Sequence, residues 1–234
     1  MIPILQKTNP LQKNELGDVF AVLIDKEETW TSFDVVNKLR YFLKIKKIGH
    51  AGTLDPFAKG LMILGIGKGT KALQEFSGLS KCYEAVIRFG TETDTLDKTG
   101  AVIMQKPVEN LNIAQIENAV NQLKGEIEQI PPMYSAKKVN GKRLYKLARK
   151  NKIVERQPVK INIFSADILD WNKPELLIKL HVSKGTYIRS YADDLGKELG
   201  CGAHLIDLRR TAIGPYKVEN SFTISEFMKY WAEQ

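Results

Sequence analysis

The stretch from Tyr83 to Phe89 constrains the fold more than any other part of the sequence. Every second residue in it is apolar, and Glu84 and Arg88 lie between them. This period of two is typical of a strand that packs one face on a hydrophobic core. The apolar runs from Asp18 to Ile24 and from Leu61 to Ile66 predict further strands, the first of them buried.

Apolar residues at helical spacing predict helices between the strands. Thr31 or Ser32 caps the first of them, and a capping box of Asn112 and Gln115 opens another. The sequence therefore combines helices and strands, which predicts an α/β or α+β fold. Further expectations are a polar loop at Lys46–Lys59, strands at Val159–Ile168, Leu176–Val182 and Leu205–Ile213, a helix ended by Gly200, a helix capped by Thr223, and inward faces formed by Phe33, Val36, Leu39 and Leu43 and by Ile113, Ile116, Val120 and Leu123.

The positive charge is concentrated in one segment. Of the formal charge of +8, residues Lys137 to Lys160 contribute ten basic residues and one acidic residue, and the remainder has 25 basic and 26 acidic residues. A patch of this kind favours a polyanion, nucleic acid first. A solvated lysine-rich helix face is the alternative, and the charge run alone does not choose between them.

Metal and nucleotide sites are not expected. Cys82 and Cys201 are the only cysteines, and the C-x-x-H spacing of Cys201 and His204 lacks enough further ligands for a zinc site. The glycines around Gly65 match neither of the two common phosphate-binding loops. Because the chain also has neither a signal peptide nor an apolar run of membrane-spanning length, we expect a cytoplasmic protein.

The loop Gly49 to Pro56 reads G-H-A-G-T-L-D-P and precedes Ala58, Gly60 and Leu61. On composition alone, its acid would be a turn residue. The order of these residues, however, resembles the signature loop of the TruB family of pseudouridine synthases. This resemblance implies that Asp55 is the essential catalytic residue and that His50 contacts RNA.

Further blocks resemble the family in the same order, from about Val22 to Arg210. The resemblance implies that Tyr83 stacks on the target base, that Tyr187 is the second aromatic, that Arg189 pairs with the catalytic aspartate, and that Leu208 lines the uracil pocket. The remaining blocks are Gly90–Thr95, Pro131–Ala136 and Gly141–Tyr145, and the last two resemble the insertion of the bacterial branch.

The resemblance implies a pseudouridine synthase fold, with a mixed, mainly antiparallel sheet flanked by helices. It implies one catalytic domain over residues 1–234, in which a basic insertion at about 125–160 clamps RNA. The implied reaction breaks the N1–C1′ bond of the tRNA T-loop uridine at position 55 and rejoins the base through C5. It needs no cofactor, metal, membrane or protein partner, and we expect a monomer that binds the tRNA T arm.

Two departures from the family pattern stand out. Asp-Lys-Pro-x-Gly-x-Thr-Ser is replaced by a sequence with Glu27 and Thr29 at the proline and glycine positions, so we expect a differently built turn beside Lys26. About 24 residues follow Arg210, which is too few for the C-terminal PUA domain of many relatives.

Two other functions compete with this hypothesis. A dyskerin-like, guide-RNA-dependent subunit would rely on a PUA domain and lack the bacterial insertion, which is the reverse of this chain. A non-catalytic RNA chaperone would not need Asp55, Tyr83, Tyr187 and Arg189 together.

Overall fold

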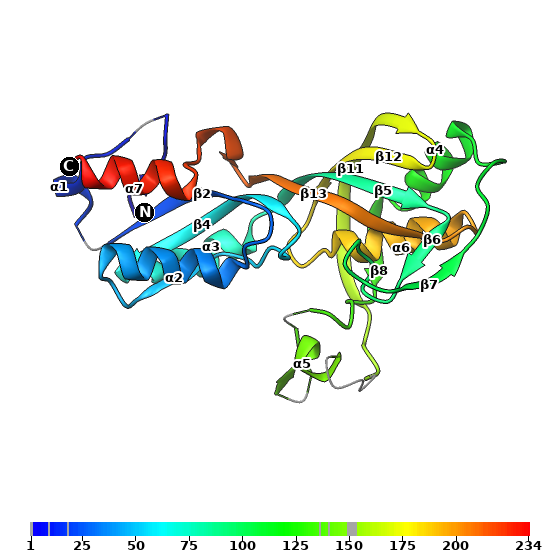
Figure 1. Cartoon of the computed structure of the whole chain (residues 1–234), viewed down its shortest axis with the longest axis horizontal. Coiled ribbons are helices and arrows are strands. Elements are labelled where there is room, and N and C mark those ends of the chain that lie inside the picture. Colours follow the sequence, from blue (N-terminus) through cyan, green and yellow to red (C-terminus); the bar gives the residue numbers. More distant parts are fainter. Residues whose placement is uncertain (1, 9, 18, 136, 140, 149–153) are drawn as a thin grey trace. The chain divides into compact units, whose positions relative to one another are not determined.

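The computed structural model describes the chain except for residues 1, 9, 18, 136, 140 and 149–153 (Figure 1). It divides into two compact units, of which unit 1 comprises Met1–Tyr83 with Arg209–Gln234 and unit 2 comprises Glu84–Leu208. The chain enters unit 2 within strand β5 (Lys81–Phe89) and returns to unit 1 within strand β13 (Ala203–Ile213).

Unit 1 is built on a sheet in which β2 pairs with β1 in parallel and with β4 in antiparallel orientation. The strands predicted around Phe20 and Ile63 are therefore confirmed. The loop predicted from Lys46 to Lys59 is partly wrong, because its start forms β3, which pairs with β4. The sequence did not predict β3 because this strand has only three residues, one of them Gly49, which is too short for a recognisable periodicity. The strands are β1 (Ile4–Leu5), β2 (Val19–Lys26), β3 (Ile48–His50), β4 (Lys59–Gly67) and β14 (Tyr216–Lys217).

Helices of unit 1 begin where the capping residues predict. Thr31 caps α2 (Ser32–Leu43), and Thr223 caps α7 (Ile224–Ala232). Phe33 was expected to face the core, and this prediction is wrong, because its side chain is 59% exposed and stacks with Arg40. The buried stripe of α2 runs through Ser32, Val35, Val36 and Leu39 instead. The remaining helical segments are α1 (Lys13–Leu16), η1 (Lys68–Ala72), α3 (Leu73–Gly78) and η2 (Val218–Asn220).

Gly60 fixes how closely β4 and β13 approach each other in unit 1. Its φ is +114°, and a Cβ at this position would lie 2.3 Å from the carbonyl oxygen of Arg210. The two residues are partners in the parallel register of these strands. Only glycine allows this approach, which brings Arg209 and Arg210 of β13 beside the start of β4.

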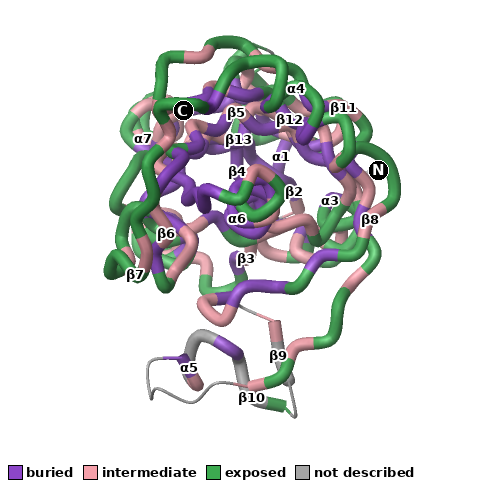
Figure 2. Tube along the Cα trace, turned by 90° about the vertical axis from the view of Figure 1, so that its right-hand side faces the viewer, coloured by how far each residue is buried: buried purple, intermediate pink, exposed green. Residues whose placement is uncertain are grey.

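Unit 2 contains the strand order β13-β5-β12-β11-β8, and the registers of β11 with β12 and of β11 with β8 are antiparallel. The alternation predicted along β5 is confirmed, and purple, buried backbone follows its central strands in Figure 2. A mixed, mainly antiparallel sheet flanked by helices is thus confirmed. The elements are β6 (Thr91–Thr93), β7 (Val102–Gln105), α4 (Ile113–Gln122), β8 (Gly125–Gln129), β11 (Val159–Asn172), β12 (Glu175–Val182) and α6 (Ile188–Glu198).

Asn112 caps α4 as predicted, but Ile113 is 38% exposed and does not belong to its buried face. In the basic segment, β9 (Lys138–Val139) and β10 (Lys142–Arg143) pair with each other, and the predicted short helix is α5 (Leu144–Ala148). Residues 149–153 lie outside the described part of the chain. So do most of the other basic side chains of this segment, including those of Lys142, Arg143 and Lys146. The basic side chains expected to clamp RNA therefore lie mostly outside the described residues, and the clamp stays a prediction.

Candidate active site

Asp55 lies half-buried in the loop between β3 and β4 of unit 1. The residue before it is fixed by α2, because the Ser32 hydroxyl donates to the Leu54 carbonyl oxygen at 3.0 Å and accepts from the Leu54 amide at 2.8 Å. Behind Asp55, the Ala58 amide donates to the Asp55 carbonyl oxygen at 3.1 Å. The backbone on both sides of the carboxylate is therefore held in place.

Lys26, the last residue of β2, holds the far side of this loop. Its side chain is fully buried. Its Nζ donates to the carbonyl oxygens of Glu27 at 2.8 Å, Trp30 at 2.7 Å and Pro56 at 3.3 Å. Burial lowers the pKa of Lys26 to about 8, and the charge of Asp55 opposes this change. Lys26 is thus a positioning residue that links the turn after β2 to the residue following Asp55.

The turn after Lys26 contains an unusual backbone conformation. Thr29 has a φ of +73°, a left-handed conformation at the position where the family pattern has glycine, and its amide donates to the Pro56 carbonyl oxygen at 2.9 Å. A β-branched residue adopts this left-handed conformation at a cost of about 1–3 kcal/mol.

Arg210 and His50 complete the surroundings of the loop in unit 1. Arg210 is 2% exposed, and its guanidinium donates to the carbonyl oxygens of Leu61 at 2.7 Å and Gly52 at 3.2 Å. The Gly52 amide donates to Nδ1 of His50 at 3.3 Å. Burial first, and the charge of Arg210 second, lower the pKa of His50. Its imidazole is therefore neutral at pH 7.

Arg189 lies in the first turn of α6 in unit 2 and is 4% exposed. Its guanidinium donates to the carbonyl oxygens of Thr95 at 3.0 Å and Tyr134 at 2.7 Å, and lies 3.4 Å from Oδ2 of Asp97. Asp97 in turn accepts from the hydroxyl of Thr95 and from the amide and hydroxyl of Thr99. Sequence analysis missed Asp97, although it lies two residues beyond the family-like block that ends at Thr95.

Gln129 positions Tyr187 in unit 2. Gln129 is fully buried at the end of β8, and its side chain accepts from the Tyr187 amide at 2.8 Å and donates to the Tyr187 carbonyl oxygen at 3.1 Å. Tyr187 is the N-cap residue of α6 and remains half-buried. Sequence analysis also missed Gln129, since a single polar residue in a strand gives no signal of its partner.

The predicted site residues fall into two groups. Unit 1 holds His50, Asp55 and Tyr83, and unit 2 holds Tyr187, Arg189 and Leu208. Tyr83 and Leu208 are buried, with 8% and 5% exposure. The pairing of Arg189 with Asp55 stays a prediction.

The described part of the chain contains no cluster of three or more His, Cys, Asp or Glu side chains that could bind a metal ion. None of its helices has both the length and the hydrophobicity of a membrane span.

Comparison with known proteins identifies one family. The N-terminal domain of TruB family pseudouridylate synthases matches residues 40–188, and the C-terminal domain of tRNA pseudouridylate synthase B matches residues 189–234. A tRNA pseudouridine synthase B of Solibacter usitatus is 44% identical over 91% of this chain and 73% of its own length. The protein of the same name from Protochlamydia amoebophila is 48% identical over 88% of this chain and 78% of its own length.

Solved structures agree with the fold. A Cbf5-Nop10-Gar1 complex matches with a TM-score of 0.74 and 25% identity over 97% of this chain. An H/ACA RNP bound to a substrate RNA containing 2′-deoxyuridine matches with a TM-score of 0.69 and 25% identity over 91% of this chain. This chain spans 58% and 54% of the length of the matched chains.

Replacing Thr29 by glycine tests the strain in the turn after Lys26. Glycine adopts a positive φ without the steric cost, although it also gives the unfolded chain more freedom. Because the Thr29 side chain is exposed, we expect the free energy of unfolding to rise by about 0.5–1 kcal/mol. Denaturant unfolding measures the change, and Thr29→Ala, which keeps a Cβ, is the matched control. A less stable glycine variant would contradict the assignment of strain.

Replacing Lys26 by methionine tests the buried ammonium. Three carbonyl oxygens lose a charged donor, so we expect the free energy of unfolding at pH 7 to fall by about 2 kcal/mol or more. The folded pKa of Lys26, about 8, lies below the ordinary 10.5. Between these values the unfolded chain binds more protons, so wild type should gain stability relative to the variant as the pH rises, by at most about 1.4 kcal/mol per unit.

The measurement is denaturant unfolding of both proteins from pH 7 to 10. A constant difference between them over this range would show that Lys26 does not titrate in it.

Proposed function

We propose that this chain, which belongs to the TruB family of pseudouridylate synthases, converts the T-loop uridine at position 55 of tRNA to pseudouridine. One observation carries this proposal: relatives named tRNA pseudouridine synthase B are 41–48% identical over about nine-tenths of the chain. The experiment that tests it is to incubate the purified protein with an unmodified tRNA transcript and to map pseudouridine at each position.

The chemistry requires an ionised carboxylate beside the reacting sugar. Isomerisation cuts the N1–C1′ bond and rejoins the base through C5, with no redox change and no cofactor. An aspartate can serve this reaction by attack at C1′, by attack on the base, or by removal of a proton from the sugar. We assign this role to Asp55, whose backbone is fixed by Ser32 and Lys26.

The target uridine must leave the stack of the folded T loop before the reaction. We assign Tyr83 and Tyr187 to stacking on the extruded base, which contributes roughly 1–3 kcal/mol per stacked base, and Leu208 to the wall of the uracil pocket. His50 contacts the RNA, and its lowered pKa keeps the ring neutral, so that it acts by shape and hydrogen bonding.

We assign to Arg189 the role of keeping the carboxylate of Asp55 ionised. A guanidinium beside a carboxylate favours its ionised form. The buried contact with Asp97 and the two carbonyl acceptors fix the orientation of Arg189 in unit 2, which supports this role. In this proposal Asp97 is a positioning residue that acts through Arg189.

The basic segment at about 125–160 is proposed to clamp the RNA. Its sequence carries a formal charge of +9 between Lys137 and Lys160. We further propose that residues 1–234 act as one catalytic domain, as a cytoplasmic monomer that needs no cofactor and no protein partner.

Asp55→Asn should abolish pseudouridine formation and leave RNA binding largely intact, because an amide is neither a nucleophile nor a base at this site. Mapping of pseudouridine and a binding titration with the same tRNA give the two readouts. Asp170→Asn, at an exposed position of β11, is the matched control and should form pseudouridine at the wild-type rate. Product formation by a folded Asp55→Asn protein would refute the role of Asp55.

Changing Lys142, Arg143, Lys146 and Arg149 together to glutamine tests the clamp. Each lost phosphate contact should flatten the log–log dependence of RNA affinity on salt by roughly 0.7–0.9. Thermal unfolding of both proteins is the control for correct folding of the variant. Parallel salt plots for wild type and variant would mean that this segment is only a solvated face.

A further inference from the structure

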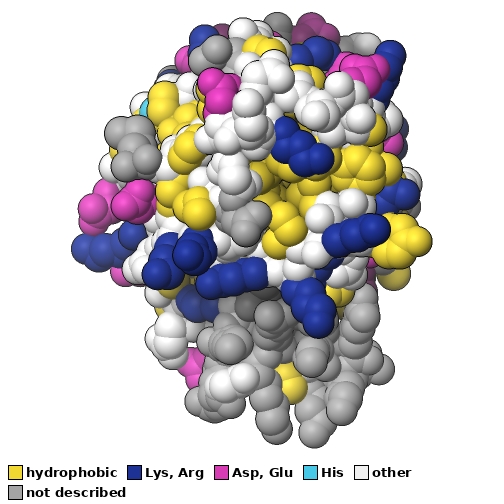
Figure 3. Space-filling model, turned by 90° about the vertical axis from the view of Figure 1, so that its left-hand side faces the viewer, with side chains coloured by type: hydrophobic (Ala, Val, Ile, Leu, Met, Phe, Trp, Pro, Cys, Tyr) yellow, Lys and Arg dark blue, Asp and Glu magenta, His cyan; other side chains and the backbone are white. Residues whose placement is uncertain are grey.

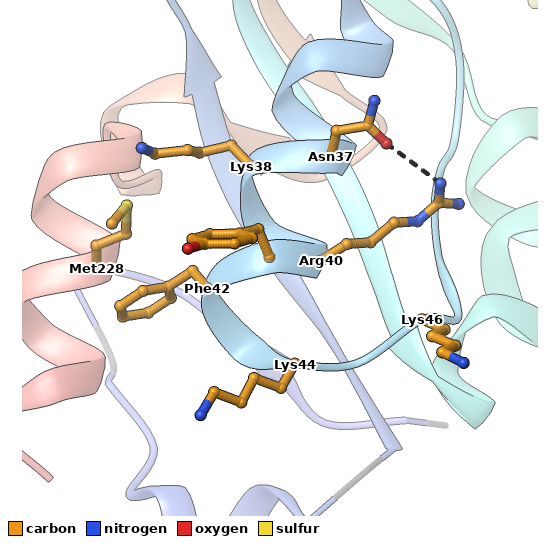
Figure 4. A pocket seen from close by; sticks show the side chains of 8 residues that line it. Asn37, Lys38, Arg40, Phe42, Lys44, Lys46 and Met228 are labelled. Atoms are coloured by element: carbon orange, nitrogen blue, oxygen red, sulfur yellow. Dashed lines mark hydrogen bonds between the residues drawn. The ribbon is translucent and has the colours of Figure 1, made fainter.

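A groove with a basic border lies between α2 and α7 in unit 1. Its volume is about 890 Å³. Figure 3 shows this end of the unit, where Lys and Arg side chains border hydrophobic ones. In Figure 4, the ring of Phe42 and the chain of Lys38 extend from α2 toward α7, which carries Met228, and the chain of Lys44 extends from the end of α2. The lining residues are Asn37, Lys38, Arg40, Tyr41, Phe42, Lys44, Lys46 and Met228.

The charge around this groove has a single sign. The sequence from Val35 to Leu54 contains five basic residues and no acidic residue. Arg40 is occupied, since it donates to the Ile48 carbonyl oxygen at 2.7 Å and stacks with Phe33. Lys38, Lys44 and Lys46 are exposed, and none of them forms an ion pair with a described residue. A helix C-terminus carries only about half a negative charge, which does not balance three cations.

Tyr41 gives this surface a second feature that suits a nucleic acid. Its side chain is 87% exposed, whereas the next residue, Phe42, packs edge-on against Phe227 of α7 at 6.5 Å between ring centres. Phe42 therefore fastens α2 to α7, and Tyr41 is left to the solvent. Lysines next to an exposed aromatic ring combine phosphate attraction with base stacking, which is the combination that binds single-stranded nucleic acid.

The position of the groove on α2 relates it to the Asp55 loop within unit 1. Ser32, which fixes Leu54, begins this helix. A helix rises about 1.5 Å per residue, so Tyr41 lies about 14 Å along the axis from Ser32. A nucleic-acid duplex carries about one negative charge per 1.7 Å of its axis. An RNA strand that runs from Asp55 along α2 would present several phosphates over this distance.

We propose that the groove formed by Lys38, Tyr41, Lys44 and Lys46 binds the phosphate backbone of the substrate RNA beside the target nucleotide, with an unpaired base stacked on Tyr41. The identity of that RNA rests on the proposed function. The groove is separate in sequence from the basic segment at 137–160, so the two surfaces can be tested independently.

The first experiment removes the three cations. Lys38→Gln, Lys44→Gln and Lys46→Gln are combined, and the matched control combines Lys124→Gln, Lys179→Gln and Lys217→Gln, which remove the same charge from exposed positions away from the groove lining. The dissociation constant for an unmodified tRNA transcript is measured across a salt series. We expect the groove variant to lose roughly two to three units of log–log slope and the control to parallel wild type. At saturating tRNA, kcat should stay within twofold of wild type.

Equal slopes for the groove variant and the control would overturn the proposal. Salt-sensitive binding of polyglutamate, lost in the groove variant while tRNA binding is unchanged, would instead assign the groove to an acidic protein. Pseudouridine mapping with wild type is scored separately. If wild type forms no pseudouridine but the slopes differ, the proposed reaction fails and the RNA surface stands.

The second experiment tests stacking. Tyr41→Ala should weaken tRNA binding about fivefold or more, and Tyr41→Phe, which keeps the ring, should bind like wild type. Thermal unfolding should be unchanged in both variants because the side chain is exposed. Wild-type affinity in Tyr41→Ala would show that Tyr41 does not contribute to RNA binding. Equal losses of affinity in both variants would show that the hydroxyl contributes rather than the ring.

Discussion

The buried ammonium of Lys26 is the interaction on which the Asp55 loop depends. An ammonium costs several kcal/mol to bury unless hydrogen bonds replace its water. Here its three acceptors are carbonyl oxygens of Glu27, Trp30 and Pro56, so a single cation joins the end of β2, the following turn and the Asp55 loop. The strained conformation of Thr29 is tolerated because it delivers its amide to the Pro56 carbonyl oxygen.

The charges of unit 1 act on one another around this loop. Asp55 favours the protonated form of Lys26, while Arg210 opposes it and also disfavours a charged His50. Lys26 and Arg210 are both buried beside the loop, and a neutral imidazole at His50 avoids adding a third positive charge.

The parts of the fold that sequence predicted are those in which one local rule decides the outcome. The alternation along β5 and the caps at Thr31, Asn112 and Thr223 each depend on neighbouring residues only. Phe33 was misplaced because the first turn of a helix has no preceding turn to define its buried face.

The predicted site residues came from short sequence motifs that resemble the family. The residues that position them could not be predicted in this way. Gln129 meets Tyr187 58 positions along the chain, and Arg189 meets the Thr95 carbonyl oxygen 94 positions away. Nothing in the local sequence encodes such a distant partner. At Thr29, a β-branched residue has a left-handed backbone, and its amide and the ammonium of Lys26 both donate to the Pro56 carbonyl oxygen. The local sequence does not predict this conformation.

Both units use buried cations bound to backbone carbonyl oxygens to fasten loops. Arg210 holds Gly52, Arg189 holds Thr95 and Tyr134, and Lys26 holds Pro56. A carbonyl oxygen does not titrate, and arginine stays charged at any pH that a folded protein experiences. Lys26 differs, because its pKa of about 8 is close to neutral pH. The support of the Asp55 loop is therefore the one of these three fastenings that changes charge as the solution becomes mildly alkaline.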